Sequence, residues 1–121
     1  MVWDIEVTDQ FKEWYKGLSE DELAKVAGSI EVLEERGTNL GYPHSSKIMG
    51  ARNKHMRELR IQYRGDPYRV LYAFDPRRIA ILLLGGNKGS DKQWYDTFVP
   101  IADDLYDEHL IEIAKEESDN G

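Results

Sequence analysis

The sequence of 121 residues contains no cysteine, which excludes disulfide bonds, thiolate metal sites and a thiol nucleophile. No G-x-S-x-G pattern marks a serine nucleophile either. No apolar run approaches the ~20 residues that span a bilayer. The first eleven residues are acidic and lack the basic segment and apolar core of a secretory signal peptide. We therefore expect a cytoplasmic protein with one domain, residues 1–121, in which residues 116–121 form a frayed tail.

Positive charge is scarce overall, since the formal net charge is -7, but it is concentrated in one segment. Residues 1–43 carry four Lys or Arg against ten Asp or Glu, residues 44–92 carry eleven against four, and residues 93–121 carry one against nine. Screening at physiological salt acts over ~8 Å, so a ligand at the middle segment would experience mainly local positive charge. In the alternative interpretation, the acidic flanks neutralise this segment within the fold.

Residues 54–88 predict three consecutive antiparallel strands, joined by turns at 64–67 and 75–78. Successive strand side chains point to opposite faces of a sheet. This alternation places Glu58 and Arg60 of the first strand on the same face as Arg69 of the second, opposite a mostly apolar face. A charge in mid-strand needs a partner or a ligand. The cluster is therefore either an anion-binding site or an internal ion-pair network around Glu58.

The N-terminal third predicts one strand and two helices. Residues 2–7 alternate like a half-buried strand. Thr8 is placed to cap a short helix that ends near Leu18, and Ser19 begins a capping box for a second helix. That helix is expected to end near Gly37, in a left-handed cap.

The remaining segments predict two further elements. Residues 47–49 are expected to form a short extra strand. A pattern break at residues 85–89 precedes a last helix, which runs from residue 90 or 91 to about 115, with a kink or a junction of two helices at Pro100. Together these elements predict an α+β fold with an N-terminal strand, a helical hairpin, an antiparallel three-stranded meander and a C-terminal helix.

Other candidate sites have competing interpretations. The glycine-rich segment 85–89 lacks the spacing of a nucleotide-binding loop, so Lys88 is either a phosphate contact or a flexible exposed lysine. Four carboxylates of the last helix favour a solvated acidic face over a magnesium site. The three histidines have no metal-binding spacing, and His55 is either a proton carrier or a surface residue. The carboxylates are Asp103, Asp104, Asp107 and Glu108.

Three stretches resemble the RelE/HigB family of toxin–antitoxin toxins, in particular its phage-derived Gp49-like branch. They are Met56-Arg57-Glu58-Leu59-Arg60, Tyr68-Arg69-Val70-Leu71-Tyr72-Ala73-Phe74 and Ile81-Leu82-Leu83-Leu84-Gly85-Gly86-Asn87-Lys88. The resemblance covers nearly the whole chain. It implies a RelE-like fold and a toxin that enters the ribosomal A site and cuts mRNA without a metal or other cofactor. It also implies a HigA-like helix-turn-helix antitoxin as partner, in a hetero-oligomer, with a homodimer as a further possible state.

The resemblance implies a role for several residues. Arg69 matches the family's phosphate-stabilising arginine, and Arg60 shares that task or orients the substrate. Glu58 is the expected general base at the ribose 2′-OH. Lys88 contacts the phosphate, and Tyr95 stacks on a base or assists the leaving group. The expected RNA contacts are Lys47, Lys54, Arg57 and Lys92.

The sequence also departs from the family pattern. Several RelE members have lysines where this chain has Glu58 and Arg60, so the identity of the base stays open. The family also includes ParE relatives that poison gyrase and lack nuclease residues, so a non-catalytic inhibitor or protein-binding module is the alternative function. The acidic C-terminal segment is either an antitoxin-facing surface or solvated.

Overall fold

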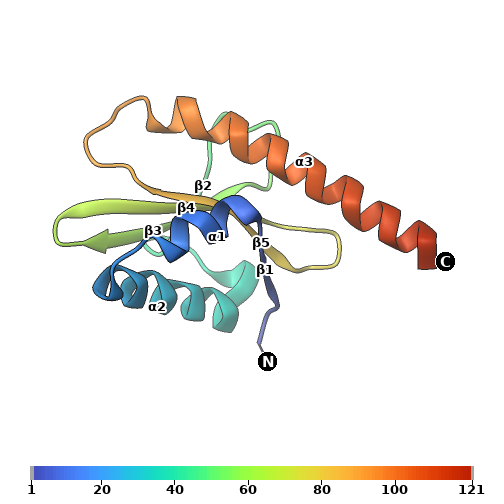
Figure 1. The fold of residues 1–121 in the computed structure, drawn as a ribbon, viewed down its shortest axis with the longest axis horizontal. Helices are drawn as coiled ribbons and strands as arrows, with labels where there is room; N and C mark the ends of the chain where they lie inside the picture. The colour runs from blue at the N-terminus through green and yellow to red at the C-terminus, as the bar shows by residue number, and fades with distance from the viewer. Residues whose placement is uncertain (1, 121) are drawn as a thin grey trace.

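The computed structural model describes residues 2–120 and has three layers (Figure 1). A five-stranded sheet lies in the middle, with α3 on one face and α1 and α2 on the other. This confirms the predicted α+β class. The elements are β1 (Ile5–Val7), α1 (Asp9–Lys16), α2 (Glu20–Arg36), the 3-10 turn η1 (Gly37–Asn39), β2 (Ser45–Lys47), β3 (Arg57–Tyr63), β4 (Asp66–Phe74), β5 (Ala80–Asn87) and α3 (Trp94–Asn120).

The strand order is β1-β5-β4-β3-β2. The predicted meander is present, because β4 pairs antiparallel with both β3 and β5. Two edge strands complete the sheet: β1 runs parallel to β5, and β2 runs antiparallel to β3. The extra strand predicted at residues 47–49 is wrong by two positions, since β2 covers 45–47. Its buried residue is Ser45, whose hydroxyl lies 2.6 Å from the Tyr72 hydroxyl, so no apolar pattern marks this strand.

The sheet is buried on both faces, whereas the alternation predicted a core on only one of them. The α1–α2 face packs one apolar cluster, which includes Phe11, Val26, Leu33, Val70 and Leu82. The α3 face packs a second, which includes Leu71, Ile81, Leu83, Trp94 and Leu105. Because α3 covers part of the face that carries Glu58 and Arg69, these charged side chains lie at the border of a hydrophobic layer.

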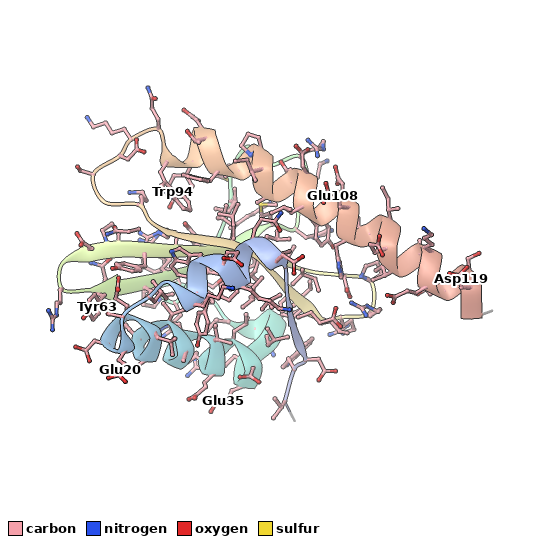
Figure 2. All side chains as sticks on the ribbon, viewed as in Figure 1. Glu20, Glu35, Tyr63, Trp94, Glu108 and Asp119 are labelled. Carbon is pink, nitrogen blue, oxygen red and sulfur yellow. The ribbon has the colours of Figure 1, made fainter. Side chains whose placement is uncertain are left out.

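The expected pattern break at residues 85–89 is wrong, because β5 continues through Gly85, Gly86 and Asn87. Both glycines leave room for an aromatic ring. A Cβ atom at Gly85 would lie 2.4 Å from two ring carbons of Trp14, and one at Gly86 would lie 3.2 Å from the Trp94 ring. Figure 2 shows Trp94 pointing from the start of α3 toward the sheet. The two glycines therefore allow Trp14 and Trp94 to pack directly against β5.

Replacing Gly85 with alanine is expected to destabilise the protein by about 1–3 kcal/mol, because the added methyl group overpacks against Trp14. Gly28 provides the matched control. A Cβ atom there meets nothing within 4 Å, so Gly28→Ala within α2 is expected to stabilise by about 0.5–1 kcal/mol. Urea unfolding of the three proteins measures both changes. Equal stability of wild type and Gly85→Ala would contradict the packing argument.

The caps of the N-terminal helices follow the sequence. The Thr8 side chain accepts a hydrogen bond from the Phe11 N–H, and Ser19 and Glu22 form both bonds of the capping box. The prediction for Gly37 is half right. Its φ is 56°, but its ψ of -128° lies outside the left-handed helical region. A Cβ atom there would overlap the ring of Trp3, so Gly37 gives room to that side chain.

The last helix differs most from its prediction. α3 is one continuous helix from Trp94 to Asn120, with Pro100 inside it, so two helices do not meet there. Residues 116–120, which were expected to form a frayed tail, belong to this helix, and Gly121 lies outside the described residues. Pro100 is exposed and close to the helix start, so the backbone bond it removes leaves a carbonyl facing water. No helix in the described part of the chain has both the length and the apolar character needed to cross a bilayer.

Candidate active site on the α3 face of the sheet

The two central strands β3 and β4 carry the charged residues of the site. Arg60 and Arg69 are direct cross-strand partners, and Glu58 pairs with Leu71 two positions away. All three therefore share one face, as the alternation predicts. Glu58 and Arg69 are each only 5% exposed, whereas Arg60 is half-buried.

The Glu58 carboxylate is the centre of a hydrogen-bonded cluster. Its Oε1 accepts a 2.6 Å hydrogen bond from the Tyr95 hydroxyl and lies 3.3 Å from Arg69 Nε. Its Oε2 accepts a 2.6 Å bond from the Ser46 hydroxyl and a 3.4 Å bond from Arg60 Nη1. The ion-pair network considered from sequence is thus present. Because the carboxylate is shared by two guanidinium groups and two hydroxyls, it is held in one orientation.

Arg69 has one guanidinium nitrogen available for a ligand. Its Nε donates to the Tyr95 hydroxyl at 3.2 Å, and its Nη1 donates to the Tyr68 carbonyl at 3.0 Å. Its Nη2 has no hydrogen bond to any described residue. Within residues 2–120 no buried side-chain nitrogen lacks a partner, so this Nη2 reaches the surface. Arg69 is largely buried and therefore presents only its Nη2 amino group to solvent.

Tyr95, from the first turn of α3, connects the strands to the loop after β5. Lys88 Nζ lies 5.8 Å from the centroid of the Tyr95 ring, within cation–π range. Burial, and then the hydrogen bond to Glu58, raise the pKa of Tyr95, so its hydroxyl stays protonated at neutral pH. Arg60 has a similar aromatic neighbour, since its Cζ lies 5.3 Å from the Tyr42 ring centroid.

A groove gives access to Tyr95 from solvent. It has a volume of about 390 Å³ and lies between residues 49–52 and the first turns of α3. The other lining residues include Met49, Arg52, Val99 and Asp103. Glu58, Arg60, Arg69, Lys88 and Tyr95 are thus brought together, and the groove at Tyr95 is lined by none of the three cations.

The predicted RNA contacts do not form one surface. Lys47, Lys54 and Lys92 are exposed at the end of β2, in the turn before β3 and in the loop before α3, respectively. Arg57 lies on the opposite face of the sheet from Glu58, because it is two residues before the buried Leu59. Its Nε donates to the Ser45 hydroxyl at 3.0 Å, which is a structural contact.

The acidic face predicted for α3 is wrong in its central part. Asp103 is 3% exposed and holds the segment before β3. Its carboxylate accepts bonds from the backbone N–H of Arg52 at 2.8 Å, the N–H of Asn53 at 3.0 Å and the Asn53 amide at 2.9 Å. Asp104 and Asp107 contact the Arg52 guanidinium. We call the hydrogen bonds that the Asp103 carboxylate accepts the Asp103 clamp. The sequence contained no sign of it, because the partners lie 50 residues apart.

A second polar cluster was also missed from sequence. The Asp75 side chain, between β4 and β5, is fully buried and lies 2.7 Å from Arg77 Nη2 and 2.8 Å from His109 Nε2 of α3. Arg77 also contacts Glu6 of β1 at 3.0 Å. The cluster therefore joins α3 to the β4–β5 turn and to the edge strand β1. The three histidines do not converge, and His109 serves this network.

The buried Asp75 predicts a pH-dependent stability. Burial alone raises the pKa of Asp75, but hydrogen bonds from Arg77, His109 and the Ile79 N–H outweigh it, so its pKa is lowered. A lowered folded-state pKa contributes stability at neutral pH, which is lost as the pH falls through that pKa. Asp75→Asn is expected to reduce stability at pH 7 and to flatten the acid side of the stability profile. Urea unfolding between pH 7 and pH 3 tests this, with the exposed Asp104→Asn as the control that leaves the slope unchanged.

The chain is similar in sequence to a known protein family. The family model described as phage derived protein Gp49-like matches residues 13–107. The chain belongs to this family. Two Mycobacterium tuberculosis members, named as candidate toxins, are similar to it. HigB2 is 42% identical over 112 residues, or 91% of this chain, and HigB3 is 46% identical over 95 residues, or 78%. The chain spans 55% of the length of HigB2 and 82% of HigB3.

Solved structures show that this Gp49-like protein has the RelE fold. The isolated E. coli RelE toxin superposes with a TM-score of 0.57 and 11% identity, over 82% of this chain and 98% of that one. RelE in the RelE–RelB complex of Pyrococcus horikoshii OT3 gives 0.54 and 16%, over 74% and 99%. The protein therefore belongs to the Gp49-like family and has the RelE fold.

Proposed function

We propose that the protein is a toxin that inhibits translation as a metal-independent endoribonuclease acting on ribosome-bound mRNA. The observation that carries the proposal is the Glu58 carboxylate held between Arg60 and Arg69 and hydrogen-bonded to Tyr95. Cleavage of RNA by its own 2′-OH needs a base, positive charge at the phosphorane and an acid at the 5′-oxygen. These three kinds of group lie in contact here.

The roles follow from the contacts. Glu58 accepts the 2′-OH proton, and its fixed orientation lowers the entropic cost of aligning it. Arg69 donates through its open Nη2 to a non-bridging phosphate oxygen, while its Nε keeps Tyr95 in place. Tyr95 is protonated at neutral pH and supplies a proton to the leaving oxygen. Arg60 and Lys88, both less buried than Arg69, add positive charge on either side of this arrangement.

Exposed lysines contact the RNA or rRNA backbone. Lys47, Lys54 and Lys92 are accessible, and phosphate contacts of this kind position a nucleic acid without reading its sequence. Arg57 is proposed as a separate RNA contact, because its side chain is on the other face, where its Nε is bonded to Ser45. Because ribosomes are the target, the proposed site of action is the cytoplasm.

The proposed partner is a HigA-like helix-turn-helix antitoxin. A RelE toxin of the same fold is complexed with RelB in the P. horikoshii structure. An antitoxin that covers the Arg60 side of the sheet would block access to the site without any chemical change. Copurification with the product of a neighbouring helix-turn-helix gene supports this partner, and a solitary gene product that is harmless on expression contradicts it.

The nuclease proposal is tested by mapping mRNA ends. Purified protein is added to a translating extract, and primer extension locates new 5′ ends at codons in the ribosomal A site. Cleavage that requires ribosomes and leaves 2′,3′-cyclic phosphate ends supports the proposal. The proposal is overturned if mRNA stays intact in cells whose growth the protein arrests.

One observation favours a second candidate. Both oxygens of Glu58 are already hydrogen-bonded, and Arg69 is largely buried, as in a purely structural ion-pair network. In a ParE-like inhibitor, this network would only stabilise the fold, and inhibition would come from binding another protein. Such an inhibitor would stop DNA synthesis before protein synthesis, so pulse labelling with thymidine and methionine separates the two functions.

A further inference from the structure

The residue facing Glu58 on the neighbouring strand has the geometry of a proton carrier. Ser46 of β2 and Glu58 of β3 are direct cross-strand partners. The Ser46 hydroxyl donates to Glu58 Oε2 at 2.6 Å, and the backbone ladder on both sides fixes this pair. Ser46 is half-buried, whereas Glu58 is 5% exposed, so Ser46 is the more accessible residue of the pair.

The Glu58 carboxylate is poorly placed to receive a substrate hydroxyl directly. Tyr95 and Arg69 occupy Oε1, and Ser46 and Arg60 occupy Oε2. A serine hydroxyl has one donor and two acceptor lone pairs. Ser46 uses its donor on Glu58 and accepts no hydrogen bond from any described residue. The Ser46 lone pairs are therefore available to accept a hydrogen bond from the ribose 2′-OH. Both carboxylate oxygens of Glu58 already accept hydrogen bonds.

We propose that Ser46 relays the proton of the ribose 2′-OH to Glu58, an inference that rests on the nuclease function proposed above. The 2′-OH gives its proton to Ser46 Oγ while Ser46 gives its own proton to Glu58 Oε2. The 2′-oxygen then forms a bond to phosphorus, and the bond from phosphorus to the 5′-oxygen breaks. The leaving oxygen keeps the bonding electron pair and takes the Tyr95 proton, which solvent replaces. Ser46 ends unchanged, and Glu58 returns its proton to water.

Three variants test the relay in single-turnover cleavage of ribosome-bound mRNA, at the codon mapped for the wild type. Ser46→Ala is expected to slow the cleavage step about 10- to 100-fold with little change in the half-saturating ribosome concentration. Ser46→Thr keeps a hydroxyl and is expected to restore most of the rate. Ser45→Ala is the matched control: it removes the neighbouring hydroxyl on the other face, which lies 2.6 Å from Tyr72, and is expected to lower thermal stability but not the rate.

A solvent isotope experiment separates a relay from a structural role. In mixtures of H₂O and D₂O, two protons moving together give a curved dependence of rate on deuterium fraction. The wild type should show this curve, and Ser46→Ala a flatter one, because the Tyr95 proton still moves. An unchanged rate, or a curve equally strong in Ser46→Ala, overturns the relay while leaving the nuclease function intact. A wild type that leaves ribosome-bound mRNA uncut overturns both.

Discussion

Replacing Arg69 with alanine is expected to reduce mRNA cleavage at least about 10²-fold, because the variant loses the donor that meets the developing charge on the phosphate. Arg69→Lys keeps the charge but loses the planar fork that holds Tyr95 through Nε and the Tyr68 carbonyl through Nη1. We expect this variant to retain only a small part of the activity. Single-turnover cleavage and growth after induced expression measure both effects.

The control for Arg69 must separate chemistry from folding. Removing Arg69 takes one cationic partner from the buried Glu58, which itself lowers stability. Thermal unfolding of each variant therefore accompanies the rate. Arg64→Ala is the matched surface control, because Arg64 lies in the turn between the same two strands and its side chain is 75% exposed. Full activity of a folded Arg69→Ala protein would contradict the assigned role and favour the ParE-like candidate.

Removing the Asp103 carboxylate is expected to cause the largest loss of stability. In Asp103→Ala, the N–H groups of Arg52 and Asn53 lose a charged acceptor that is itself only 3% exposed. Each unsatisfied buried donor lowers the free energy of unfolding by about 1–3 kcal/mol. Because water can hydrogen-bond to one of the two donors, we expect a total loss of about 2–4 kcal/mol. Urea unfolding at constant pH measures the loss.

The neighbouring Asp104 is the matched control for the Asp103 clamp. It lies on the same helix one residue later, its side chain is 72% exposed, and its only contact in the described chain is with the Arg52 guanidinium. Asp104→Ala should change stability little. If both variants unfold at the same urea concentration, the clamp does not hold the segment before β3. Because that segment lines the groove to Tyr95, Asp103→Ala is also expected to reduce cleavage.

Local sequence rules placed the centre of the candidate site but not its surroundings. A period of two was sufficient to put Glu58, Arg60 and Arg69 on one face, because strand geometry leaves no other choice. The same rule puts Arg57 on the opposite face, so its predicted RNA contact would lie apart from Glu58. The capping box at Ser19 was also predictable, since it depends only on four adjacent residues.

The features that were missed all depend on contacts between distant segments. β2 has no apolar pattern, so the pairing of Ser46 with Glu58 could be found only from the strand register. Gly85 and Gly86 resemble a loop until Trp14 and Trp94 are known to pack on them. The acidic residues of α3 resemble a solvated face until the segment before β3 is known to fold against Asp103.

The position of β1 has a consequence for how the protein is made. β1 pairs with residues 80–82, and the Thr8 hydroxyl donates to the Leu83 carbonyl across 75 positions of the chain. During synthesis the N-terminal strand must wait, unpaired, until β5 has left the ribosomal exit tunnel, since long-range pairings cannot form earlier. A nascent copy therefore acquires its finished sheet only after β5 lies outside the ribosome that we propose it attacks.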